Sequence, residues 1–320
     1  MDVTAALSSL LSAPVLAFAF GLITVAVRSD LRVPDAMTQG LSIYLLLAIG
    51  LKGGIALRGT EASSLVVPLG LAIALGVAIP AVAFVVLRWL TPFDAVDRGA
   101  IAAHYGSTSL VTFTAALVAL EAAAIAVPGY AATMLTVLEI PGILVGLLLA
   151  RRHSQTSGRW GATLHEIVTG KSILLLTGGM AMGAIIGEGG YASVEPLFGD
   201  LFRGALVLFL LALGIEAAQH FGALRHGALG LVVFATVFPL VTGTLTVLLG
   251  SAVGLGVGGS AILGVLCASA SYIAAPAAVR MALPEATLAY PLTASLGVTF
   301  PVNLVVGIPL YAWIASSIGA

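Results

Sequence analysis

Long apolar runs alternate with short polar stretches along almost the whole chain, in a pattern typical of membrane-spanning helices. A helix that crosses a bilayer needs about 17 to 25 mostly apolar residues. We count ten such runs, near residues 11–27, 37–57, 63–88, 99–120, 128–150, 168–187, 203–219, 227–252, 259–279 and 287–316. The pattern therefore predicts an all-α integral membrane protein with ten transmembrane helices.

Two of these runs, the fourth and the ninth, are interrupted by polar residues near their centres. In the ninth run Pro276 follows a cluster of hydroxyls, and the carbonyl of Tyr272 loses its helical partner because proline has no amide hydrogen. Backbone freed in this way is tolerated at membrane depth only where it is buried in protein or lines a polar cavity. We therefore expect interrupted helices 4 and 9 to cross at a binding site. Its expected residues are Gly106, Ser107, Thr108, Ser109, Thr112, Ser269, Ser271 and Tyr272.

A crossing of this kind favours a small oxyanion as the ligand. The N-terminus of each half-helix carries a positive dipole end and unpaired amides, so an anion could bind without a buried arginine. The alternative is that serine, threonine and glycine only allow close helix packing, which is common in membrane bundles. The coincidence of Pro276 with the hydroxyl cluster favours a binding site.

The two halves of the chain resemble each other. Residues 40–51 correspond to residues 204–215, and the serines of the fourth run correspond to Ser269 and Ser271 at an offset of 162. The most polar segment, residues 151–171, lies between the halves and is expected to be a cytoplasmic linker. It separates a first five-helix repeat (1–150) from a second (172–320). Because each repeat has an odd number of spans, the two must be inverted relative to each other.

Composition and charge agree with the membrane class and predict an orientation. Hydrophobic residues make up 60% of the chain and charged residues 8%, against about 25% in soluble domains. Ten basic residues follow the odd-numbered spans and three follow the even-numbered ones, which predicts cytoplasmic odd loops and both termini outside the cell membrane. A net charge of −1 without a basic run gives no indication of nucleic-acid binding.

An acidic residue near the middle of the fifth span is a candidate cation site. Placing Glu139 at this depth costs on the order of 3 kcal/mol, so such a residue is a functional candidate. Pro141 also frees the carbonyl of Val137, and hard oxygens suit sodium or, on the carboxylate, a proton. Thr299 is the matching position in the second half. The alternative is a protonated carboxyl group that is hydrogen-bonded to a neighbouring helix.

Other polar residues in the spans have simpler interpretations. Lys52 and Glu216 stand at equivalent positions of the halves and could form an ion pair or bind substrate, although snorkelling to opposite surfaces explains them equally well. Asn303 is expected to make a helix-to-helix hydrogen bond. His104, beside the first hydroxyl cluster, could tune the site or simply pack. The histidines show no metal-ligand spacing, so no transition-metal site is expected.

Several of these motifs together resemble the sodium-dependent bicarbonate transporter family. The resemblance rests on residues 46–54, 106–109, 139–141, 213–216, 268–276 with Arg280, and 307–310. It implies ten helices in two inverted five-helix units, a core part and a gate part, and a homotrimer. It also implies sodium-driven uptake of bicarbonate, with sodium as the coupling ion and no other cofactor, and a PII-like protein that binds the cytoplasmic face.

The chain departs from the phototroph members of that family at the ninth span. Tyr272 stands where those members have an aspartate, and Ala268, Ala270 and Ala274 stand in a region that is richer in serine there. Loss of that aspartate would leave Glu139 as the remaining acid near the site. On the strength of the resemblance, we expect a sodium-coupled symporter that imports bicarbonate. A sodium- or proton-coupled transporter of another small anion and an anion channel or sensor are the alternatives, and an enzyme is not expected.

Overall fold

The structure is helical throughout the part of the chain that it describes. This computed structural model describes residues 12–152, 160–220 and 228–319, and it has no strand within them. Eight helical segments are long and apolar enough to cross a bilayer, and two shorter apolar helices, α2 (Ala13–Ala26) and α12 (Gly256–Ala268), accompany them. The all-α membrane class is thus confirmed. The expected ten full-length spans are not all found, because α2 would extend only about 21 Å and α12 is one half of the interrupted ninth run.

The remaining helices follow the expected runs closely. In chain order they are α3 (Asp35–Arg58), α4 (Ala62–Leu90), α5 (Ala95–Gly106), α6 (Leu110–Ala122), α7 (Ala131–Arg151), α8 (Trp160–Thr169), α9 (Lys171–Tyr191), η1 (Pro196–Asp200), α10 (Phe202–His220), α11 (Ala228–Ala252), α13 (Ala275–Ala282), α14 (Ala289–Leu292), η3 (Thr293–Thr299), α15 (Phe300–Val302), η4 (Asn303–Gly307) and α16 (Ile308–Ile318).

The expected linker contains a helix of its own. Helix α8 lies within residues 151–171 and packs against α13, while residues 153–159 of that segment lie outside the described part of the chain.

Both expected helix interruptions are present. The fourth run stops at Gly106 and resumes at Leu110, and the ninth stops at Ala268 and resumes at Ala275. Pro276 lies in the first turn of α13 instead of kinking a continuous helix. A proline is well placed there because the first amides of a helix have no helical partner and the fixed φ of proline suits the helix start.

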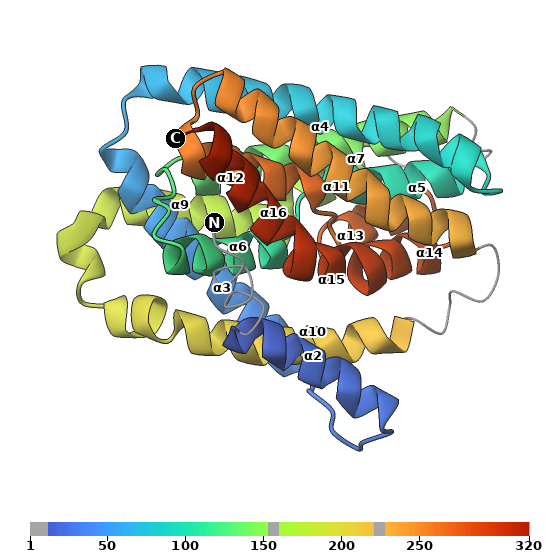
Figure 1. Ribbon diagram of the computed structural model, residues 1–320, viewed down its shortest axis with the longest axis horizontal. Helices are drawn as coiled ribbons and strands as arrows, with labels where there is room; N and C mark the ends of the chain where they lie inside the picture. The colour runs from blue at the N-terminus through green and yellow to red at the C-terminus, as the bar shows by residue number, and fades with distance from the viewer. Residues whose placement is uncertain (1–11, 153–159, 221–227, 320) are drawn as a thin grey trace.

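The helices form two groups. The outer group consists of α2, α3, α9 and α10, in which α2 packs against α10 and α3 against α9. The crossing group consists of α4 to α7 and α11 to α16. Figure 1 shows α2 and α10 together along one edge of the molecule and α4 along the opposite edge. In the most apolar stretch of the interrupted helix at 95–122, 89% of the residues are buried, against 28% in α4, so this helix is central and α4 peripheral.

Helices α3 and α9 approach each other so closely that their backbones touch. Gly50 of α3 faces Gly179 of α9, while Gly54 lies against the Met180 backbone and Gly183 against the Leu51 backbone. A Cβ atom added to Gly50 would lie 2.8 Å from the carbonyl oxygen of Leu176. Small residues at such a contact let membrane helices gain packing energy where no hydrophobic force drives them together.

This contact predicts that alanine substitutions at two glycines of α9, Gly183 and Gly178, have different effects on stability. In Gly183→Ala the new methyl group would collide with the Leu51 carbonyl, so we expect the protein to lose about 1–3 kcal/mol of stability. Gly178 faces open space, so Gly178→Ala is expected to be neutral or to stabilise by up to about 1 kcal/mol. Thermal unfolding in detergent measures both. Equal midpoints for the two variants would contradict the close α3–α9 contact.

Candidate functional site at the helix crossing

The two interruptions meet and are joined by hydrogen bonds in both directions. The backbone amide of Ser109 donates to the Ser269 hydroxyl oxygen at 2.9 Å. The backbone amide of Ser271 donates to the carbonyl oxygen of His104 at 2.8 Å. Each broken segment therefore supplies partners that the other segment lost when its helix stopped. The expected crossing of helices 4 and 9 is thus a direct, hydrogen-bonded contact between the two interrupted segments.

Two serines of the crossing cap the half-helices that start there. The Ser109 hydroxyl accepts a hydrogen bond from the amide of Thr112, 3.2 Å away, at the start of α6. The Ser271 hydroxyl accepts from the amides of Ala274 and Ala275, each at 3.3 Å, at the start of α13. This capping role is one that serine commonly takes at helix N-termini. Sequence alone did not separate it from ligand binding.

Some polar groups at the crossing remain without a partner. Among the described residues we find no hydrogen bond from the backbone amides of Leu110 and Val111, the first two residues of α6. The hydroxyls of Ser107 and Tyr272 are also buried without a hydrogen-bond partner in the described part of the chain, and Tyr272 lies close to Ser109. A buried polar group without a partner costs about 1–3 kcal/mol, so such a cluster marks a place where a polar ligand would bind.

The two amides were not identified from the sequence, because a backbone group leaves no side-chain signal. Their availability depends on which amides the nearby serines cap, and only the folded geometry shows that.

Other predicted residues support the crossing from behind. The Thr108 hydroxyl donates to the carbonyl oxygen of Leu135 on α7 at 3.3 Å. Gly106 faces Gly142 of α7, where an added Cβ atom would lie 2.7 Å from the Gly142 Cα atom. Gly106 thus sets the close approach of α5 and α7, while Thr112 contributes its amide to the Ser109 cap.

Asn303 and His104 complete the polar surroundings. The side-chain amide of Asn303 donates to the Ala268 carbonyl oxygen at 2.7 Å, which satisfies the last carbonyl of α12. The expected helix-to-helix hydrogen bond of Asn303 is thereby confirmed. His104 bonds the Ala100 carbonyl oxygen through Nδ1 at 2.7 Å, and its buried Nε2 has no partner.

Glu139 lies in a cavity that reaches the unwound part of the ninth run. Its side chain is 5% exposed, and the Ser172 hydroxyl is its hydrogen-bond partner. The cavity has a volume of about 280 Å³, and Glu166 and Lys171 line it together with Ile273 and Ala274. An acid in the fifth span therefore borders the same segment that carries Ser271 and Tyr272. Ser172 was not identified from the sequence because it stands among many similar small residues.

The other two predicted cation-site residues differ in position. Val137 lies on α7 one turn before Pro141, which cannot donate to the Val137 carbonyl. Thr299 lies elsewhere: its hydroxyl is 2.6 Å from the Tyr105 hydroxyl and donates to the Ala235 carbonyl oxygen at 2.6 Å. None of these contacts involves the Glu139 cavity. The structure therefore keeps Glu139 and Val137 on one helix but does not bring Thr299 to them.

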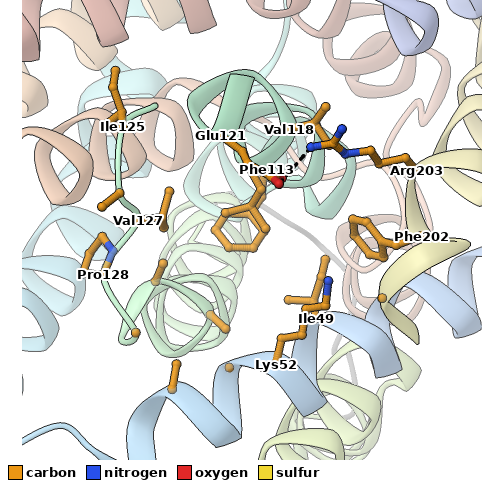
Figure 2. A pocket seen from close by; sticks show the side chains of 18 residues that line it. Ile49, Lys52, Phe113, Val118, Glu121, Ile125, Val127, Pro128, Phe202 and Arg203 are labelled. Carbon is orange, nitrogen blue, oxygen red and sulfur yellow. Dashed lines mark ion pairs between the residues drawn. The ribbon is translucent and has the colours of Figure 1, made fainter. Parts of the chain in front are cut away.

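Lys52 and Glu216 are not neighbours. The Lys52 ammonium lies 5.2 Å from the ring centroid of Phe202, at the start of α10. Glu216 lies 14 residues further along α10, about 21 Å along the helix axis. Lys52 instead lines a hollow of about 420 Å³, where Arg203 and Glu121 form an ion pair at 2.9 Å (Figure 2). Glu121 and Arg203 were not singled out from the sequence because charged residues at span ends are ordinary.

One known protein family matches nearly the whole chain. The sequence model of the family described as the Na+-dependent bicarbonate transporter superfamily matches residues 13–316. The match includes both interruptions, Glu139 and the Lys52 hollow. No curated protein matches the chain.

The hydrogen bond between the two interruptions predicts a specific loss of stability. Ser269→Ala removes the acceptor of the buried Ser109 amide, and we expect this to cost about 1–3 kcal/mol. Ser317→Ala is the matched control, because the exposed Ser317 bonds only within its own helix and its loss is expected to stay within about 0.5 kcal/mol. Unfolding midpoints in detergent compare the two. A Ser269→Ala midpoint equal to the control would show that the crossing does not depend on this bond.

Proposed function

The chain belongs to the Na+-dependent bicarbonate transporter superfamily, and from this premise we propose that it is a sodium-coupled symporter that imports bicarbonate across the cell membrane. Membership implies a multi-pass membrane transporter and not an enzyme. The observation that supports the proposal most strongly is the cluster of unpartnered polar groups at the crossing of two broken helices. Such midplane crossings bind the substrate in many secondary transporters.

In this proposal bicarbonate binds at the N-terminus of α6. The amides of Leu110 and Val111 lie at the N-terminus of α6, which is the positive end of its dipole, and would donate to an oxyanion. The hydroxyls of Ser107 and Tyr272 can add two further donors. Ser109, Ser269 and Ser271 would hold the two backbones in place. No buried arginine is required, which suits a singly charged anion that must also be released.

The proposed cation site consists of the Glu139 carboxylate and the Val137 carbonyl. A cation there would lie beside residues 273–274, next to the segment that lines the anion site. Opposite charges held this close in a low-dielectric region strengthen each other's binding, which couples the two fluxes. Thr299, with its hydroxyl bonded to Tyr105, would offer an oxygen at the symmetry-related position.

We further propose that ten helices form two inverted five-helix repeats, at residues 1–150 and 172–320, with a cytoplasmic linker at 151–171. The outer group pairs α3 with α9 and α2 with α10, so helices of both halves mix there, and this supports a two-fold relation between the halves. The outer group would act as the gate part and the crossing group as the core part. Both termini would lie outside the cell.

A homotrimer and a PII-like regulator at the cytoplasmic face also belong to this proposal, and they follow from the family resemblance.

A second candidate is proton coupling at the same site. By the family resemblance, Tyr272 stands where the phototroph members have an aspartate. Glu139 is buried beside the Ser172 hydroxyl, which can bond either form of a carboxyl group. Proton-coupled uptake of bicarbonate or another small anion would use the same residues.

The proposal predicts that purified protein in liposomes accumulates radiolabelled bicarbonate when an inward sodium gradient is imposed. Replacing sodium by potassium on both sides should abolish accumulation. Accumulation that follows an imposed pH gradient without sodium would favour the proton-coupled alternative. No bicarbonate flux under any gradient would contradict the proposed substrate, and small carboxylates would be the next anions to measure.

Glu139→Gln tests the coupling role. Glutamine keeps the size and the hydrogen bond to Ser172 but removes the charge, so sodium stimulation of uptake should disappear while the protein still folds. Glu188→Gln, at an exposed acid of α9, should leave sodium stimulation unchanged. An unaltered sodium dependence in Glu139→Gln would exclude Glu139 as a cation ligand.

A further inference from the structure

The Lys52 hollow lies between the two helix groups. Helices α3 and α10 of the outer group form one side of it, and α6 and the start of α7 in the crossing group form the other. Among its lining residues Lys52, Arg203 and Glu121 are charged, and almost all the others are apolar. In Figure 2 the Lys52 side chain extends from α3 toward the hollow, and Arg203 reaches across from α10 to Glu121 on α6. Two bases and one acid leave the hollow with a net positive charge.

The bases of this hollow are available to an anion. The Arg203 and Glu121 side chains are 58% and 68% exposed, and an ion pair this exposed contributes little free energy, so an incoming anion can compete with Glu121. Lys52 has no carboxylate within ion-pair distance among the described residues and lies against the Phe202 ring. The Lys52 ammonium is therefore available to an anionic ligand.

The hollow is also aligned with the crossing. Its lining residues Phe113, Leu117 and Glu121 are spaced by four along α6, and Ser109 is the next position on that face. The Phe113 amide bonds the Ser109 carbonyl oxygen at 3.0 Å, so one helical turn, about 6 Å of axis, separates them. Phe113 itself is 1% exposed and lines the hollow, so it is the lining residue of α6 that lies one turn from the crossing.

We propose that this hollow is an entry vestibule in which Lys52 and Arg203 bind the transported small oxyanion before it passes Phe113 to the crossing. The inference rests on the proposed function and adds a second, weaker anion site to it. Because the site is partly exposed, its attraction acts on capture of the anion and weakens with ionic strength. Changes at Lys52 should therefore alter KM for uptake from this side and leave the maximal rate nearly unchanged.

An experiment that places either a positive or a negative charge at position 52 tests this role. Lys52→Cys introduces an accessible thiol, since the single native cysteine, Cys267, is buried. We expect a cationic methanethiosulfonate adduct to bring KM for bicarbonate close to that of the wild type. An anionic adduct should raise KM about fivefold in low salt, and the difference should shrink in high salt. Arg58→Cys, on the same helix but outside the hollow, should show no such dependence on adduct charge.

A second measurement does not require transport. Bicarbonate should slow the labelling of Lys52→Cys by the anionic reagent, compared with the bulkier gluconate at equal ionic strength, as followed by mass spectrometry. Equal labelling rates, or active transport with the same KM for both adducts, would overturn the vestibule while leaving the proposed function intact. Protection without any uptake by the wild type would instead keep the anion site and overturn the proposed function.

Discussion

Every backbone amide and carbonyl at membrane depth must find a partner inside the protein, and the rest of this structure depends on how that requirement is met where two helices stop. The Ser109 amide finds the Ser269 hydroxyl, the Ser271 amide finds the His104 carbonyl, and Asn303 satisfies the end of α12. Among the described residues of the crossing, the Leu110 and Val111 amides and the Ser107 and Tyr272 hydroxyls remain unpaired around the start of α6. Unpaired amides and hydroxyls that lie together are available to a polar ligand, and this supports the crossing as the candidate site.

The same constraint explains how the crossing is held in position. A stripe of small residues on α5 and α7, with Gly106 against Gly142, brings the interrupted helix close to its neighbour. Glycines of α3 and α9 do the same in the outer group. The outer group and the crossing group are each tightly packed. The hollow that Lys52 lines lies between these two groups. In the proposed function, the two groups would be the parts that move against each other around the central site.

The sequence was sufficient to predict the features that depend on local chemistry. Both interruptions and the role of Asn303 follow from proline, hydroxyls and an amide in apolar runs. The number of spans stays a prediction, because α2 and α12 are apolar but shorter than the other candidate spans. Thr299 and Glu216 were grouped with distant residues because a symmetry offset gives equivalent positions and not contacts. The Arg203–Glu121 pair was missed because the packing of two helices from different halves brings it together.

The central claim is that a small oxyanion binds at the crossing, and a cryo-electron microscopy map of the protein in sodium bicarbonate, beside one in potassium gluconate, tests it most directly. The account predicts density for a small anion against the Leu110 and Val111 amides, within reach of the Ser107 and Tyr272 hydroxyls, in the bicarbonate map alone. A crossing that is identical in both maps, with bicarbonate bound elsewhere in the protein, would contradict it.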